Sequence, residues 1–272
     1  MPDIQQAASR DGTVIAYHRL GHGPPLVLAP GTGAANPVAW PATAALSARF
    51  AVCAMDRRGH GASGDAPDYA LAREAEDLAA VVDAAAPLDA GAEGAAVLGH
   101  SFGALVALEA ALLTPNIRKL ILYEPGFSPG GAAMYAPGMI ARHEALLRAG
   151  DREGVLALHY GELAGMSPVE IAAMRAGPAW PERLAAAHTV PREMRAEEAY
   201  RFDPRRFETL RTPTLLLAGG DSSEFLAAPT RALHAALPHS RIAVLAGQQH
   251  IAMYTAPELF AQAVLEFLDE PG

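Results

Sequence analysis

The chain alternates short apolar runs with longer stretches rich in alanine and leucine, and this alternation restricts the possible folds more than any other feature. The runs expected to be strands are residues 13–17, 25–29, 51–56, 95–99, 119–123, 214–218 and 241–246. Most of them are continuously apolar, which is typical of strands covered on both faces. Helices are expected at 70–85, 102–113, 227–236 and 257–268. The alternation predicts an α/β fold in which helices flank a mostly parallel central β-sheet on both sides.

The alternation stops between Pro125 and Arg211. This part has no convincing strand, and its helical stretches at 133–149, 152–163, 168–176 and 181–188 are separated by prolines. We therefore expect an all-helical insertion at 125–210 within an α/β core formed by residues 1–124 and 211–272.

Composition excludes several classes of protein. The 272 residues are 51% hydrophobic and 19% charged, which predicts a globular chain with a large core. A net charge of −9 without a large basic cluster argues against a nucleic-acid partner. Residues 1–10 lack the pattern of a signal peptide, and no apolar stretch has the length of a membrane span. These features predict a cytoplasmic protein that acts on a small molecule without a membrane partner; they do not indicate an oligomeric state. The single cysteine, Cys53, lies in an apolar run and is expected to be buried and structural.

The segment Gly99-His100-Ser101-Phe102-Gly103 has the pattern G-x-S-x-G at the end of an expected strand and the start of an expected helix. Glycine two positions to either side allows the strand and the helix to pass close together. Such a turn projects the serine hydroxyl and places it near a helix N-terminus, which favours developing negative charge. A serine that only capped the helix would not need both glycines.

A serine hydroxyl needs an imidazole base and an orienting carboxylate to act as a nucleophile. Asp221 follows the expected strand 214–218, and His250 follows the expected strand 241–246. In open α/β sheets such groups lie beyond the carboxyl ends of strands. We therefore expect a catalytic triad of Ser101, Asp221 and His250, and their order along the chain is the one found in α/β-hydrolases.

Four segments in the same order as in that family support this interpretation. Besides residues 99–103 they are Asp56-Arg57-Arg58-Gly59-His60-Gly61-Ala62-Ser63, Pro30-Gly31-Thr32-Gly33 and Gly247-Gln248-Gln249-His250. Over nearly its whole length the chain resembles an α/β-hydrolase fold enzyme. The resemblance implies that the insertion at 125–210 is a cap over the site. It also suggests Glu124, which follows the expected strand 119–123, as an alternative acid, because some relatives place their acid there; otherwise Glu124 is expected to support the site from the hinge into the cap.

The oxyanion hole is expected to consist of two backbone N–H groups, those of Thr32 and Phe102. Arg57 and Asp56 are expected to stabilise the loop below the site. Apolar residues expected to line a substrate pocket are Trp40, Met134, Tyr135, Met139 and Trp180. The histidines show no metal-ligand spacing, and neither a metal nor an organic cofactor is expected.

The function expected from these features is a serine hydrolase that cleaves a small or medium, largely apolar carboxylic ester, thioester or lactone through an acyl-enzyme on Ser101. A carbon–carbon bond hydrolase and a cofactor-free perhydrolase or haloperoxidase would use the same triad and remain alternatives. A ligand-binding or lyase- or cyclase-like protein of the same fold is a third alternative. The natural substrate, its acyl chain length and its pathway are not indicated by the sequence.

Overall fold

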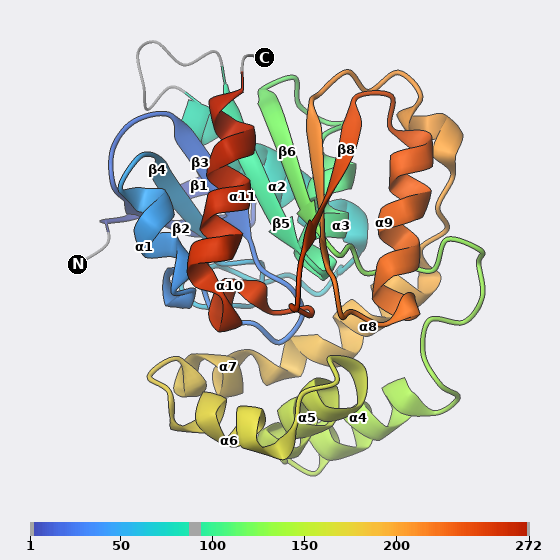
Figure 1. Cartoon of the computed structure of the whole chain (residues 1–272). Coiled ribbons are helices and arrows are strands. Elements are labelled where there is room, and N and C mark those ends of the chain that lie inside the picture. The colour runs from blue at the N-terminus through green and yellow to red at the C-terminus, as the bar shows by residue number, and fades with distance from the viewer. Residues whose placement is uncertain (1–2, 87–93, 271–272) are drawn as a thin grey trace.

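A mostly parallel sheet forms the centre of the chain, whose computed structural model describes residues 3–86 and 94–270 (Figure 1). Within these residues the strand order is β1-β2-β4-β3-β5-β6-β7-β8. β2 pairs antiparallel with β1 and β4, and all the other pairs are parallel. The strands are β1 (Asp3–Ala8), β2 (Val14–Leu20), β3 (Pro25–Ala29), β4 (Ala51–Met55), β5 (Ala95–His100), β6 (Ile117–Tyr123), β7 (Thr214–Gly219) and β8 (Ser240–Leu245). The predicted α/β fold is confirmed.

Helices cover both faces of the sheet and also form the insertion. The α-helices are α1 (Ala42–Ser47), α2 (Leu71–Ala85), α3 (Phe102–Ala110), α4 (Met139–Arg148), α5 (Arg152–Leu158), α6 (Pro168–Ala176), α7 (Trp180–Ala186), α8 (Val190–Ala199), α9 (Glu224–Ala236), α10 (Ala252–Thr255) and α11 (Pro257–Asp269). Short helical turns are η1 (Pro37–Ala39), the π-helical η3 (His159–Leu163), η4 (Ala187–Thr189) and η5 (Pro204–Phe207).

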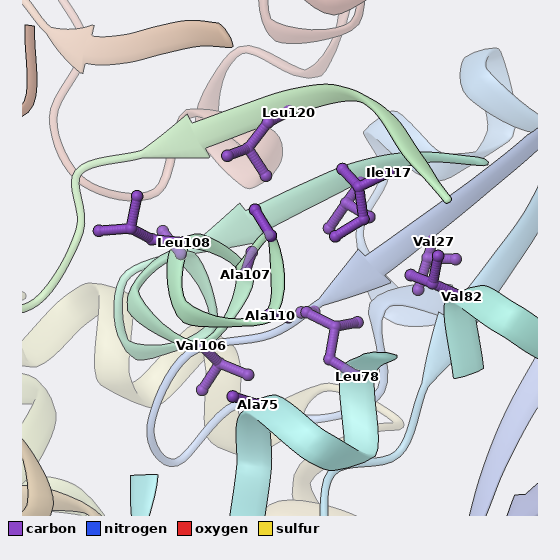
Figure 2. Close-up of a cluster of buried hydrophobic side chains, with 14 of the residues drawn as sticks. Val27, Ala75, Leu78, Val82, Val106, Ala107, Leu108, Ala110, Ile117 and Leu120 are labelled. Atoms are coloured by element: carbon purple, nitrogen blue, oxygen red, sulfur yellow. The ribbon is translucent and has the colours of Figure 1, made fainter. Parts of the chain in front are cut away.

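Each face of the sheet has its own hydrophobic core. On one face, side chains of α2, α3 and α9 pack against the strands, and Figure 2 shows Leu78, Val106 and Ile117 among the members of this cluster. On the other face, α1, α10 and α11 pack around Trp40 and Phe260. Helix α3 is apolar almost all round because it is buried on nearly every side, as expected for a helix that belongs to the core.

The helices α4 to α7 lie together below the sheet in Figure 1, apart from the helices that flank it. They form a third hydrophobic cluster around Leu156, Tyr160 and Trp180. No strand occurs in the insertion, residues 125–210, all of which the structure describes. The sequence missed the polar edge strand β1 and, among the α-helices, α1, α8 and α10, none of which was among the expected elements.

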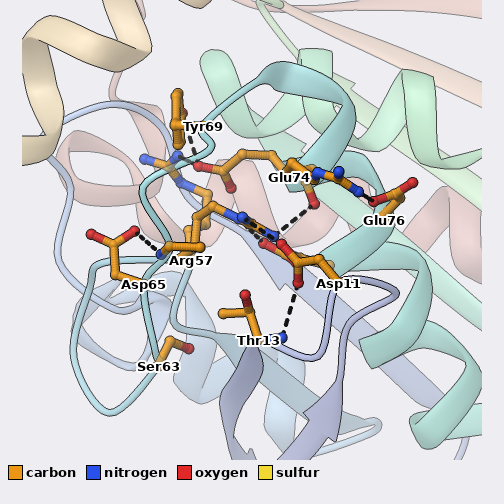
Figure 3. A network of polar contacts seen from close by, with 12 residues as sticks. Asp11, Thr13, Arg57, Ser63, Asp65, Tyr69, Glu74 and Glu76 are labelled. Atoms are coloured by element: carbon orange, nitrogen blue, oxygen red, sulfur yellow. Dashed lines mark hydrogen bonds and ion pairs between the residues drawn. The ribbon is translucent and has the colours of Figure 1, made fainter.

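A buried ion-pair network joins the insertion to the core. Arg57 donates hydrogen bonds to Glu74 on α2 at 2.8 Å and to Glu193 on α8 at 2.6 Å, and all three side chains are fully buried. Figure 3 shows Arg57 beside Glu74 and Tyr69, whose hydroxyl also donates to Glu74. Asp56 accepts a hydrogen bond from the Ala62 amide, as predicted for a residue that stabilises this loop, whereas Arg57 pairs with Glu74 and Glu193 rather than with Asp56.

None of the helices in residues 3–86 and 94–270 has both the length and the apolar character that crossing a membrane requires.

Candidate active site

Ser101 lies on a strained turn between β5 and α3. Its φ of 55° and ψ of −121° fall outside the regions that a side chain normally allows, and such strain is often found at functional positions. A Cβ on Gly99 would lie 2.4 Å from the Gly103 carbonyl oxygen, and one on Gly103 would lie 2.2 Å from the Ala29 carbonyl oxygen. The two glycines are therefore required by the close approach of strand and helix, as the sequence predicts.

The amides expected to bind an oxyanion lie beside this turn. Gly31, which precedes Thr32, packs against Ser101 so closely that an added Cβ would be 2.9 Å from the serine Cβ. Within the described residues, the amides of Thr32 and Phe102 have no hydrogen-bond acceptor. The guanidinium of Arg57 supports both, because it donates to the Gly31 carbonyl at 3.2 Å and lies over the Phe102 ring at 5.0 Å.

The carboxylate that contacts His250 is that of Glu124. The Nδ1–H of His250 donates to Glu124 Oε2 at 2.7 Å, and the Gly219 amide donates to Oε1 at 2.7 Å. The side chain of Glu124 is fully buried, and its φ of 44° is, with that of Ser101, one of two positive values among the described non-glycine residues. The sheet register explains the arrangement, since His100 pairs with Tyr123 and so brings the residues after β5 and β6 together.

Asp221, the carboxylate preferred from the sequence, does not take this position. It is exposed, its backbone amide donates to the Gln248 carbonyl at 2.9 Å, and its side chain makes no hydrogen bond to another described residue. The physical reason is that the loop after β7 places only the backbone amide of Asp221 against the loop that carries His250, whereas Glu124 directly follows β6 and its carboxylate contacts the imidazole. The expectation for Asp221 is corrected in favour of the alternative acid, Glu124.

Two neighbouring aromatic side chains hold the loop that carries His250. His100 Nε2 lies 2.8 Å from the His250 carbonyl oxygen, and the Tyr123 hydroxyl donates to the Gln249 carbonyl. Burial lowers the pKa of His100 well below its usual range, and the nearby His250 lowers it further. His100 is therefore neutral, with the proton on Nε2, and it fixes the backbone of His250 rather than acting as a base.

Two small cavities between the sheet and the insertion reach Ser101 and His250. Their volumes are about 60 and 50 Å³, which is room for a few atoms in each. The residues that line both are Thr32, Ser101, His159, Ala164 and His250. The first cavity adds mainly apolar and aromatic side chains, among them Trp40, Tyr160, Met166, Met174 and Tyr254. The second adds Gly126, Met134, Tyr135, Leu163, Glu197, Phe225 and Leu226.

The predicted pocket residues thus divide into two groups. Trp40 lines the first cavity, and Met134 and Tyr135 line the second. Met139 and Trp180 line neither of them and pack within the hydrophobic cluster of the insertion. The apolar character of Met139 and Trp180 is compatible both with packing between helices and with lining a pocket, and the sequence alone did not distinguish the two roles.

Sequence reasoning did not single out the polar cavity residues His159, Glu197 and Arg183. His159 begins the π-helical segment η3, a rare geometry that often occurs at functional sites. Burial lowers its pKa to about 4, so the imidazole is neutral. Glu197 follows Val190 and Met194 at helical spacing on the buried face of α8. An acidic residue within an apolar stripe of a helix indicates a buried polar site, but this stripe becomes visible in the sequence only once α8 is recognised as a helix.

The comparisons with known proteins agree with this architecture. Residues 26–263 match the alpha/beta hydrolase family. The chain is 32% identical over 93% of its length to the polyketide synthase ThaQ of Burkholderia thailandensis, of which it spans only 12%. A crystal structure of an alpha/beta hydrolase from Sphaerobacter thermophilus has a TM-score of 0.80 and 35% identity, covering 97% of this chain and 100% of that one. The esterase RhEst1 from Rhodococcus sp. has a TM-score of 0.77 and 26% identity, covering 99% of each chain. The chain belongs to the alpha/beta hydrolase family.

Proposed function

We propose that this chain is a serine hydrolase that cleaves small, largely apolar carboxylic esters, thioesters or lactones through an acyl-enzyme on Ser101. The observation that carries the proposal is the 2.7 Å contact between His250 Nδ1 and Glu124. It leaves Nε2 of the imidazole as the basic nitrogen, in cavities that Ser101 also lines. The similarity to a protein called an esterase adds support.

In the first half of the reaction, the Ser101 hydroxyl attacks the substrate carbonyl carbon and its proton passes to His250 Nε2. The amides of Thr32 and Phe102 donate hydrogen bonds to the oxygen that becomes negatively charged. The bond to the leaving group then breaks, and the leaving oxygen or sulfur takes the proton from His250. Glu124 accepts the Nδ1–H bond throughout and stabilises the imidazolium.

In the second half, His250 takes a proton from a water molecule that attacks the acyl-enzyme. The tetrahedral intermediate collapses, the carboxylic acid leaves and Ser101 regains its proton. The proposed mechanism uses only side chains and backbone amides of this chain. That the reaction needs neither a metal nor an organic cofactor remains a prediction. We propose that the helical insertion, residues 125–210, acts as a cap, because its side chains complete both cavities over Ser101. The small volumes favour short acyl groups.

The direct test is hydrolysis of p-nitrophenyl esters of increasing acyl length by wild type and Ser101→Ala. We expect the variant to lose activity by up to ~10⁶-fold, because the triad acts as a unit. Ser223→Ala is a matched control, since Ser223 is exposed and its side chain makes no hydrogen bond to a described residue. Ester cleavage by Ser101→Ala at the wild-type rate would contradict the proposal.

The alternatives that share the triad differ in their products. Cleavage of a diketone would indicate a carbon–carbon bond hydrolase, and halogenation dependent on peroxide and acetate would indicate a perhydrolase. A ligand-binding protein, in contrast, should react slowly or not at all with a fluorophosphonate, whereas the proposed hydrolase should be labelled on Ser101 at once.

A further inference from the structure

An acidic side chain forms part of the wall of the second cavity, which the proposed nucleophile also lines. Glu197 on α8 is 4% exposed and lines this cavity together with Ser101 and His250. Its Oε2 accepts a hydrogen bond from the Tyr135 hydroxyl. Its Oε1 has no hydrogen-bond partner among the described residues. The proposed mechanism does not use this carboxyl group.

The free oxygen of Glu197 lies close to the expected oxyanion site. A Cβ built on Gly126 would be 2.4 Å from Glu197 Oε1 and 3.5 Å from the Phe102 amide nitrogen. The two atoms are therefore no further apart than the sum of these distances. A substrate oxygen between them can be within hydrogen-bond distance of both.

The surroundings decide whether this carboxyl group is charged. Burial raises the pKa of Glu197 to about 8; the Tyr135 hydrogen bond and Arg57 lower it, and Glu193 raises it. The group is therefore largely protonated at neutral pH, and its proton is available on Oε1 because Oε2 accepts from Tyr135. The other titratable groups nearby are Glu198 on the same helix, which accepts from the Met134 and Tyr135 amides, Glu74 beyond Arg57, and His159 and His250 across the cavity.

We propose that Glu197 binds the substrate as a neutral carboxylic acid, donating a hydrogen bond from Oε1 to the carbonyl oxygen that is also held by the Phe102 amide. The inference rests on the proposed function and adds to it a third donor, one supplied by the helical insertion. It requires a substrate whose reacting oxygen only accepts hydrogen bonds. Ionisation of Glu197 removes the donor and places a negative charge where the oxyanion develops, so the enzyme should lose activity as Glu197 ionises.

The test is the pH dependence of kcat/KM for p-nitrophenyl acetate, corrected for spontaneous hydrolysis. In wild type, kcat/KM should fall above pH 8, where Glu197 ionises. In Glu197→Gln this alkaline decline should disappear, because the amide donates a hydrogen bond but does not titrate. Tyr135→Phe removes a hydrogen bond that lowers the pKa of Glu197 and should move the decline to higher pH. Glu197→Ala should lower kcat/KM at pH 7 about tenfold.

Glu258→Gln is the matched control, since it makes the same chemical change at an exposed side chain that lines neither cavity and makes no hydrogen bond to a described residue. It should keep the wild-type alkaline decline. A purely structural role for Glu197 would change stability without moving the pH profile. A decline that persists in Glu197→Gln, or that stays in place in Tyr135→Phe, overturns the inference. Ser101→Ala separates the two proposals: if it is inactive while Glu197→Gln keeps the decline, only this inference fails, whereas an active Ser101→Ala refutes the proposed function.

Discussion

Replacing Arg57 by methionine should destabilise the fold strongly, because Arg57 is the shared partner of two buried carboxylates. The side chains of Arg57, Glu74 and Glu193 are all 0% exposed, and the two contacts measure 2.8 and 2.6 Å. Methionine fills similar space but leaves both acids without a cation. Removing one partner of a buried ion pair costs about 3–5 kcal/mol, a large fraction of the 5–15 kcal/mol that typically stabilises a domain.

The loss of stability in Arg57→Met should also depend on pH, in a direction set by the numbers of protons that the folded and unfolded states bind. In wild type, burial opposes the ionisation of Glu193, but Arg57 lowers the pKa of Glu193 to about 2. The ionised Glu193 therefore stabilises the fold at pH values above its unfolded-state pKa, and this stabilisation is lost as the pH falls through its folded-state pKa. In wild type, burial already raises the pKa of Glu74 to about 7, although Arg57 lowers it. Without Arg57 the pKa of both acids rises, and the folded state then binds more protons than the unfolded state. The stability difference between Arg57→Met and wild type should therefore shrink as the pH is lowered from 8 to 5.

Urea denaturation followed by far-UV circular dichroism at several pH values measures this difference. Arg142→Met is the control, because Arg142 pairs with Glu162 at 2.7 Å while both side chains are about half exposed, and such pairs contribute about 0–1 kcal/mol. A loss below about 1 kcal/mol in Arg57→Met at pH 7, or a difference that grows on acidification, would refute the reasoning.

Two further substitutions test the geometry around Ser101. Gly103→Ala should destabilise the chain by about 1–3 kcal/mol and abolish ester cleavage, because the added Cβ would lie 2.2 Å from the Ala29 carbonyl oxygen. Gly130→Ala is the control: its added Cβ would have no atom within 4 Å, so the urea denaturation curve and the activity should stay unchanged. His100→Phe removes the hydrogen bond to the His250 carbonyl and should lower kcat with little change in KM, which steady-state kinetics would detect; an unchanged kcat would show that this bond does not position His250.

The sequence predicted the strands well because buried parallel strands are continuous apolar runs. The expected strand at 25–29 coincides with β3, whereas β1 was missed because its residues, Asp-Ile-Gln-Gln-Ala-Ala, carry no apolar run and lie mostly exposed at the sheet edge. Helix α8 was missed because Pro191 and its many charged residues did not suggest a helix, although the proline occupies the first turn, where it is tolerated.

The candidate site was predictable where local backbone geometry dictates the residues, and not where loop paths decide. The glycines around Ser101 identify the turn without any knowledge of the rest of the fold. The choice between Glu124 and Asp221 could not be made in this way, because both follow strands that end at the same edge of the sheet. Only the paths after β6 and β7 show that Glu124 contacts His250 and that Asp221 is exposed.

The central claim is that Ser101 is activated by His250 and that Glu124, rather than Asp221, orients the imidazole. The measurement that tests it most directly is kcat for p-nitrophenyl acetate in Glu124→Gln and Asp221→Asn. Glu124→Gln should lower kcat by about 10⁴-fold, because the amide carries no charge to stabilise the imidazolium. With its oxygen accepting from the Gly219 amide, its NH2 group would face Nδ1 and favour the wrong tautomer of His250. Asp221→Asn should stay within about twofold of wild type. The reverse pattern, with Asp221→Asn inactive and Glu124→Gln active, would contradict the account.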